Sequence, residues 1–134
     1  MQRSIKFILP GQPIPWSRAT PMAKGRVWDS QKHQKLIVSL AMEKLMGSQP
    51  LLEGPLEVII YCYFPIPMKH QKNPQIQNSH YFKKPDDDNC AKLLRDCANG
   101  IFYADDSLIS DGHQYKRYDD GNGVRTEMTI TEVK

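Results

Sequence analysis

The sequence is poor in the features that mark secreted and membrane-spanning proteins. It has only three cysteines, Cys62, Cys90 and Cys97, and no C-x-x-C pair. Three cysteines cannot all pair with one another, which argues against a disulfide framework. We therefore expect reduced thiols in a cytoplasmic protein. No run reaches the roughly 18 apolar residues of a transmembrane helix, which predicts no membrane partner. Nothing repeats, and the length suits a single domain over residues 1–134.

Net charge is also small, at +3, but the charges are unevenly placed. Residues 1–50 hold eight lysines and arginines against two acids, and residues 65–84 hold four lysines and no acid. Residues 85–120 carry nine acids against four basic residues. An acidic centre framed by basic segments is typical of a metal site that accepts a polyanion, although lysines also occur on any solvated face.

The acidic centre contains two groups of aspartates, Asp86–Asp88 and Asp105–Asp106. Pro85 disfavours helix for the residue before it, so the chain should enter extended, with Asp86 and Asp88 on one side. A hard cation such as Mg²⁺ takes several oxygen ligands, and acids in this pattern could converge on one ion. The alternative is that the first group only favours a helix N-terminus and the second only forms a solvated turn. An EF-hand is excluded because the glycine of its calcium loop is missing.

A short helix is predicted between the two groups. It begins near Asp88 or Asn89, both good capping residues, and runs to about Ala98. Gly100 supplies the left-handed residue that ends it, and Lys92 falls one turn beyond Asp88 on the same face. The predicted core-facing stripe comprises Leu93, Leu94 and Cys97.

This stretch resembles the motif of the RusA-type Holliday junction resolvases, a family of prokaryotic and phage endonucleases. The family pattern is K-P-D-x-D-N, a lysine three residues after the asparagine, an aspartate four further on, N-G and a D-D pair. It is filled here by Lys84-Pro85-Asp86, Asp88-Asn89, Lys92, Asp96, Asn99-Gly100 and Asp105-Asp106. Family members often carry glutamine where Ser107 and Leu108 stand and an apolar residue at Cys90, positions that do not carry the chemistry.

The resemblance implies a Mg²⁺-dependent endodeoxyribonuclease that resolves four-way DNA junctions by paired symmetric nicks in recombination and repair. It implies four catalytic residues, Asp86, Asp88, Asp106 and Lys92, of which the three aspartates bind Mg²⁺, with Mn²⁺ as a substitute. We expect Asp105 as a further metal ligand, and Asp87 and Asp96 as second choices. Two opposed cuts imply a homodimer on branched DNA. The alternatives are a metal-dependent nuclease for flaps or other branched DNA, and a non-catalytic DNA-binding module.

Contacts to the DNA backbone are expected from basic residues around the acidic centre. The candidates are Arg18, Lys24, Arg26, Lys69, Lys72, Lys83, Lys84 and Lys116. Lys116 aligns with a lysine common in the family, and the Gly-x-Pro-x-Pro opening at residues 11–15 also resembles family members. Trp16 and Trp28 suit base stacking or, more commonly, packing. His80 resembles a family histidine before K-P-D, and either a general base or a surface histidine fits it.

The expected fold is α+β, with a mostly antiparallel or mixed sheet of four or five strands and two main helices. The first long helix should be capped by Asp29 or Ser30. Its apolar side should face the core, or a second subunit, with Leu36, Ile37 and Leu40, and is widened by Met42, Leu45 and Met46. In chain order we expect a strand at Ser4–Leu9, an irregular loop at Pro10–Lys24, a helix at Gln31–Met46, a strand at Pro55–Phe64, a polar loop at Met68–Phe82, a short strand at Ile101–Tyr103, and a hairpin of Leu108–Tyr118 with Val124–Val133.

Overall fold

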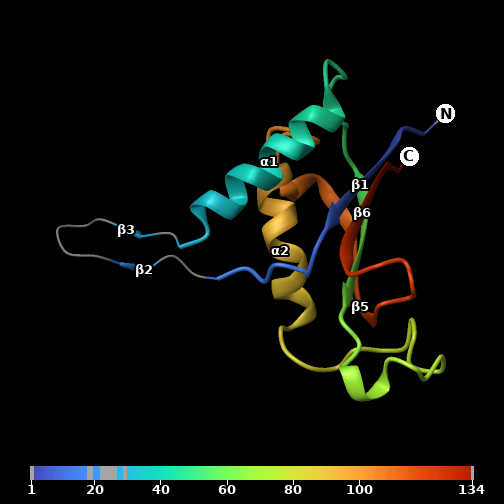
Figure 1. The fold of residues 1–134 in the computed structure, drawn as a ribbon. Coiled ribbons are helices and arrows are strands. Elements are labelled where there is room, and N and C mark those ends of the chain that lie inside the picture. The colour runs from blue at the N-terminus through green and yellow to red at the C-terminus, as the bar shows by residue number, and fades with distance from the viewer. Residues whose placement is uncertain (1, 18–19, 22–26, 29, 134) are drawn as a thin grey trace.

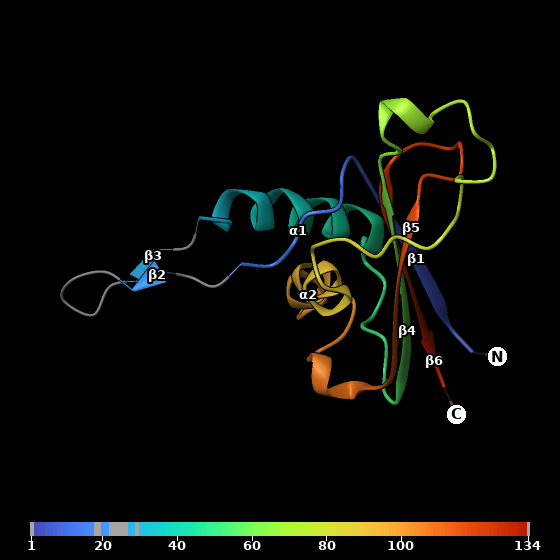
Figure 2. The same ribbon diagram turned by 90° about the horizontal axis from the view of Figure 1, so that it is seen from below.

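The structure is a computed structural model that describes residues 2–17, 20–21, 27–28 and 30–133. Figures 1 and 2 show a sheet with both helices packed on one of its faces. The predicted α+β class is confirmed, with two α-helices and a mixed sheet of four strands among the described residues. Neither of these helices has the length and apolar character that crossing a membrane requires.

The sheet is built around the most apolar strand. Its strands are β1 (Ser4–Pro10), β4 (Leu56–Phe64), β5 (Ile109–Tyr118) and β6 (Arg125–Glu132). The order is β1-β6-β4-β5, and β5 runs parallel to β4 while the other pairs are antiparallel. Alternate residues of β4, namely Val58, Ile60 and Cys62, are fully buried beneath the helices. The central strand therefore carries the core, and β5 is left at an edge.

The predicted hairpin between the last two strands is wrong, because β4 lies between β5 and β6. Residues 119–124 contain strong turn residues, which locally resemble a hairpin connection. In the structure they form a wider loop, in which Asp119 Oδ1 accepts the N–H groups of Gly121 and Gly123. A loop of this length readily spans the roughly 10 Å between two strands that flank a third. Local turn chemistry did not determine which strands pair.

Helix α1 (Lys32–Met46) begins one residue later than predicted and faces the sheet with only part of its predicted apolar side. Its buried residues, one per turn, are Val38, Met42 and Met46. Met42 and Met46 were on the predicted apolar side, whereas three other residues of that side are 52–55% exposed: Leu36, Ile37 and Leu40. Apolar side chains surround much of this helix, so their periodicity alone did not decide which stripe meets the sheet.

Helix α2 (Asp87–Ala98) begins one or two residues before the predicted start and ends where predicted. Its predicted core residues, Leu93, Leu94 and Cys97, are all buried. Gly100 has a φ of 79°, the left-handed conformation expected at this helix end. All three cysteines are free and buried, as the absence of a disulfide framework predicted.

The segment after α2 is not the predicted strand. Residues 101–103 form a turn with isolated bridges, one of which joins Tyr103 to Leu52. Phe102 and Tyr103 are both fully buried, and the Leu52 N–H donates to the Phe102 carbonyl at 2.8 Å. The rings of these two adjacent residues are thus buried within a turn and not in a strand. This turn directs the chain toward the second aspartate pair.

The segment between β1 and α1 also differs from the predicted irregular loop. It contains two strands of two residues each, β2 (Thr20–Pro21) and β3 (Val27–Trp28), which pair antiparallel. Its first part is fixed to the rest of the fold, because the Trp16 N–H donates to the Asn89 carbonyl at 2.9 Å. The predicted cap at Asp29 lies outside the described residues, and the alternative cap at Ser30 is wrong, because the structure places Gln31 at the α1 N-cap.

Candidate active site

The first aspartate group forms the N-terminus of α2, and its three carboxylates have different surroundings. Asp86 is the N-cap residue with an extended backbone, but its side chain makes no capping hydrogen bond. The Asp87 carboxylate accepts the N–H of Asp88 at 2.9 Å. Among the described residues, the carboxylates of Asp86 and Asp88 have no hydrogen-bond or ion-pair partner. Two of the three acids therefore remain available to a ligand.

The second aspartate pair divides in the same way. Asp105 caps the short 3-10 helix η3 (Asp106–Leu108) by accepting the Ser107 N–H at 3.1 Å. Hydrogen bonding from Ser107 holds the pKa of Asp105 below its usual range. Asp106, in contrast, faces a cleft between α2 and this helix. A role in a turn therefore accounts for the position of the Asp105 side chain, but it does not account for that of Asp106.

A narrow cleft of about 210 Å³ brings together residues that are distant in the sequence. It is lined by Asp88, Lys92, Arg95, Asp96 and Asp106. Burial raises the pKa of Asp96, the nearby Lys92 ammonium opposes this rise, and the negative charge of Asp106 adds to it. Three of the four residues predicted to be catalytic, Asp88, Asp106 and Lys92, therefore share one cleft.

Lys92 is held over an aromatic ring at the edge of this cleft. Its ammonium nitrogen lies 3.8 Å from the centroid of the Trp16 ring, a close cation–π contact. Trp16 itself packs against the core, which agrees with the packing interpretation of this residue. The ring restricts a long flexible side chain and so fixes the ammonium beside the acids.

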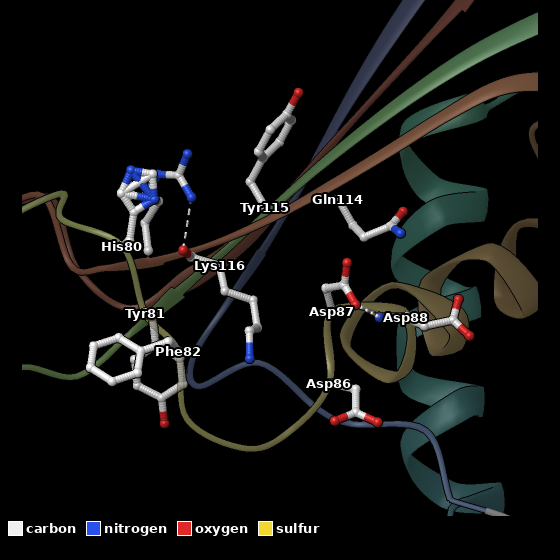
Figure 3. Close-up of a pocket in the computed structure, with 10 residues that line it drawn as sticks. His80, Tyr81, Phe82, Asp86, Asp87, Asp88, Gln114, Tyr115 and Lys116 are labelled. Atoms are coloured by element: carbon white, nitrogen blue, oxygen red, sulfur yellow. Dashed lines mark hydrogen bonds between the residues drawn. The ribbon is translucent and has the colours of Figure 1, made fainter.

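A larger groove of about 600 Å³ borders the α2 N-terminus. Figure 3 shows Asp86, Asp87 and Asp88 along one part of it and His80, Tyr81, Phe82 and Lys116 along another. Asp88 borders both the groove and the cleft. Asp86 lines the groove but not the cleft. The three aspartates predicted to be catalytic therefore do not all line one pocket in this structure.

Lys116 on β5 positions the loop that carries the first aspartates. Its ammonium donates to the carbonyls of Lys83 at 2.5 Å and Pro85 at 2.7 Å. These bonds fix the backbone next to Asp86 and use two of the three N–H donors of the ammonium. The DNA contact expected of Lys116 stays a prediction, beside this structural role.

The predicted metal site requires a donor set, and oxygen ligands are available. Among the described residues, no three His, Cys, Asp or Glu side chains are grouped closely enough to hold an ion by themselves. Mg²⁺ is commonly bound by one or two carboxylates together with waters and substrate phosphates. Pairs that share Asp88, with Asp106 in the cleft or with Asp86 in the groove, fit that mode of binding.

The remaining predicted DNA contacts are less clustered. Lys69, Lys72, Lys83 and Lys84 are exposed in the segment that leads to the acidic centre, and Arg18, Lys24 and Arg26 lie outside the described residues. His80 is exposed, pairs with Arg117 through a β-bridge and borders the groove. Sequence reasoning missed Arg95, which lines the cleft beside Lys92. Its spacing of three residues from Lys92 on a helix was a signal for this placement.

The fold and the site together describe a small α+β protein with one acidic cleft. Carboxylates of Asp88, Asp96 and Asp106 and the cations of Lys92 and Arg95 line that cleft. A family model described as Endodeoxyribonuclease RusA matches residues 10–131. The chain belongs to this family, as its motif predicted, and the match covers nearly all of it. Membership implies an enzyme of the endodeoxyribonuclease type that acts on Holliday junctions, in a family that is generally metal-dependent. No curated protein matches the chain.

Proposed function

We propose that the protein resolves Holliday junctions by paired symmetric nicks that depend on Mg²⁺, in DNA recombination and repair. The observation that carries the proposal is the meeting of Asp88, Asp106 and Lys92 in one cleft. Asp88 and Lys92 lie on α2, and Asp106 lies in η3. From the sequence, a meeting of these two segments was only an expectation. If the first aspartates only stabilised a helix N-terminus and the second pair only formed a turn, Asp88 and Asp106 would not need to line the same cleft.

In the proposed mechanism, Asp86, Asp88 and Asp106 hold Mg²⁺, with Mn²⁺ as a substitute and Asp105 as a further candidate ligand. Asp88 is central because it borders both acidic surfaces. Bound Mg²⁺ would supply activation of the attacking water and stabilisation of the leaving oxygen. The carboxylates of this chain orient that centre, and Lys92 neutralises negative charge that develops on the phosphate.

Paired nicks require two active sites, and we propose that the protein acts as a homodimer. The exposed apolar residues of α1 support a contact between subunits, because four of them lie on one helix: Leu36, Ile37, Leu40 and Leu45. We expect light scattering at micromolar concentration to give twice the mass of one chain. A monomer mass both with and without junction DNA would contradict the homodimer.

Substrate selectivity tests the proposed activity against the nearest alternatives. With Mg²⁺, we expect a synthetic four-way junction to be cut in preference to a flap and a simple duplex of matched length. Equal cutting of the flap would indicate a nuclease of broader substrate range that uses the same residues. Tight binding without cutting of any substrate would indicate a DNA-binding module and would contradict the proposed activity.

A further inference from the structure

Arg95 is a second cation in the cleft, and the role inferred for it here rests on the proposed function. It lies on α2 three residues after Lys92 and lines the cleft with Asp88, Asp96 and Asp106. None of the ion pairs shorter than 4.0 Å within the described part of the chain involves Arg95. A guanidinium placed among acids without pairing to one of them has charge available for an anionic ligand.

The position of this guanidinium is fixed from β5. Arg95 Nη2 donates to Gln114 Oε1 at 3.0 Å. Two residues earlier on the same strand, a Cβ at Gly112 would lie 2.7 Å from Nη2 and 3.4 Å from Cζ. Only glycine leaves that space free, so the guanidinium can lie against the backbone of β5. The chain therefore provides both a hydrogen-bond partner and a fitted space for this one side chain.

The backbone that carries Arg95 is fixed as well. The hydroxyl of Tyr103, a fully buried residue, donates to the Arg95 carbonyl at 3.0 Å. The Nε atom of Arg95 is buried without a partner in the described residues, so it cannot reach a ligand from solvent. Of the three guanidinium nitrogens, only Nη2 has a hydrogen bond within the described residues. Most N–H donors of the guanidinium are therefore unused within the protein. An arginine that served only to join α2 to β5 would be expected to satisfy more of them.

We propose that Arg95 binds the phosphodiester at the cleft, donating to its non-bridging oxygens beside the carboxylates of Asp88 and Asp106. A guanidinium suits this task because its planar fork matches two phosphate oxygens, whereas the ammonium of Lys92 acts as a point charge. Gly112 and Gln114 are positioning residues, since they determine where the fork lies. The ligand class is a DNA phosphodiester, and a contact of this kind carries no direct sequence information.

The test compares Arg95→Met, Arg95→Lys and Gly112→Ala by junction binding without Mg²⁺ and by single-turnover cleavage with it. We expect Arg95→Met to slow cleavage by about 10–10²-fold and to reduce the salt dependence of binding by about one phosphate contact. Arg95→Lys should restore the salt dependence but only part of the rate, because it keeps the charge without the fork. Gly112→Ala should slow cleavage by displacing the guanidinium, and should have no further effect in the Arg95→Met background.

Arg3→Met is the matched control, because Arg3 also joins segments through its guanidinium, bonding the carbonyls of Pro50 and Leu51, and does not line the cleft. It should leave the cleavage rate unchanged. Unaltered salt dependence in Arg95→Met, or a Gly112→Ala effect that persists without Arg95, would overturn the proposal. Loss of cleavage in Asp106→Asn together with wild-type behaviour of Arg95→Met would overturn this inference alone. If the wild-type protein cut nothing, the proposed function would fail, and the salt dependence of binding would still decide the role of Arg95.

Discussion

Replacing Asp88 or Asp106 by asparagine should slow Mg²⁺-dependent cleavage of a four-way junction by about 10³-fold. Each substitution keeps the shape of the side chain and removes the negative charge that would hold the cation. A loss of about 4 kcal/mol of transition-state stabilisation corresponds to a change of this size, since each 1.4 kcal/mol is tenfold. Junction binding should be retained or tightened, because a carboxylate in the cleft repels the phosphate. Asp86→Asn should behave similarly if the groove and the cleft act on one centre.

The measurement is single-turnover cleavage with gel-shift binding of the same junction. Asp111→Asn is the matched control, because Asp111 is an exposed aspartate of β5 that lines neither the cleft nor the groove. Asp105→Asn decides whether that residue is a ligand, since its carboxylate bonds to Ser107 in this structure. Cleavage near the wild-type rate in both Asp88→Asn and Asp106→Asn would show that the site has been placed wrongly.

Replacing Lys92 by methionine should slow cleavage by about 10²-fold, the typical effect of removing one preorganised electrostatic contact to a transition state. Methionine preserves much of the apolar length of the side chain, so its packing against Trp16 should persist while the charge is lost. Salt dependence of binding should fall by about one phosphate contact. Rate constants and binding at several salt concentrations measure the two effects separately.

Two further variants show whether the charge of Lys92 or its packing is responsible. Lys92→Arg should recover part of the rate, because it restores the charge with a different geometry. Lys44→Met removes a lysine from the exposed side of α1 and should leave the rate unchanged, because Lys44 does not line the cleft. A Lys92→Met protein that cuts as fast as the wild type would rule out the electrostatic role.

The acidic centre could be predicted from the sequence because its information is local. Proline before the aspartates, capping residues and the glycine after α2 act over a few residues, and they placed this helix to within two residues. The extended entry favoured Asp88 over Asp87, and the resemblance to the family favoured Asp106 over Asp105, but neither gave a physical basis for the distinction. That distinction depends on which carboxylate bonds a backbone N–H of its own turn, and Asp87 and Asp105 do so.

The failures of sequence prediction concern contacts between distant segments. The hairpin was expected because turn residues join the last two strands, yet β4 pairs with both strands and separates them. The core face of α1 depends on how the helix rotates against the sheet, which its mixed apolar surface leaves open. Arg95 was missed for the same reason, because its position depends on the space above Gly112 in another element.

Mapping the nicks in all four strands of a synthetic Holliday junction tests the central claim most directly. Wild-type protein with Mg²⁺ should cut two strands of like polarity at symmetric positions across the junction, and chelator should prevent both cuts. Asp88→Asn should bind the same junction and cut neither strand. Cuts that continue in chelator, or equal cutting by Asp88→Asn, would contradict a metal-dependent resolvase built on the cleft between α2 and Asp106.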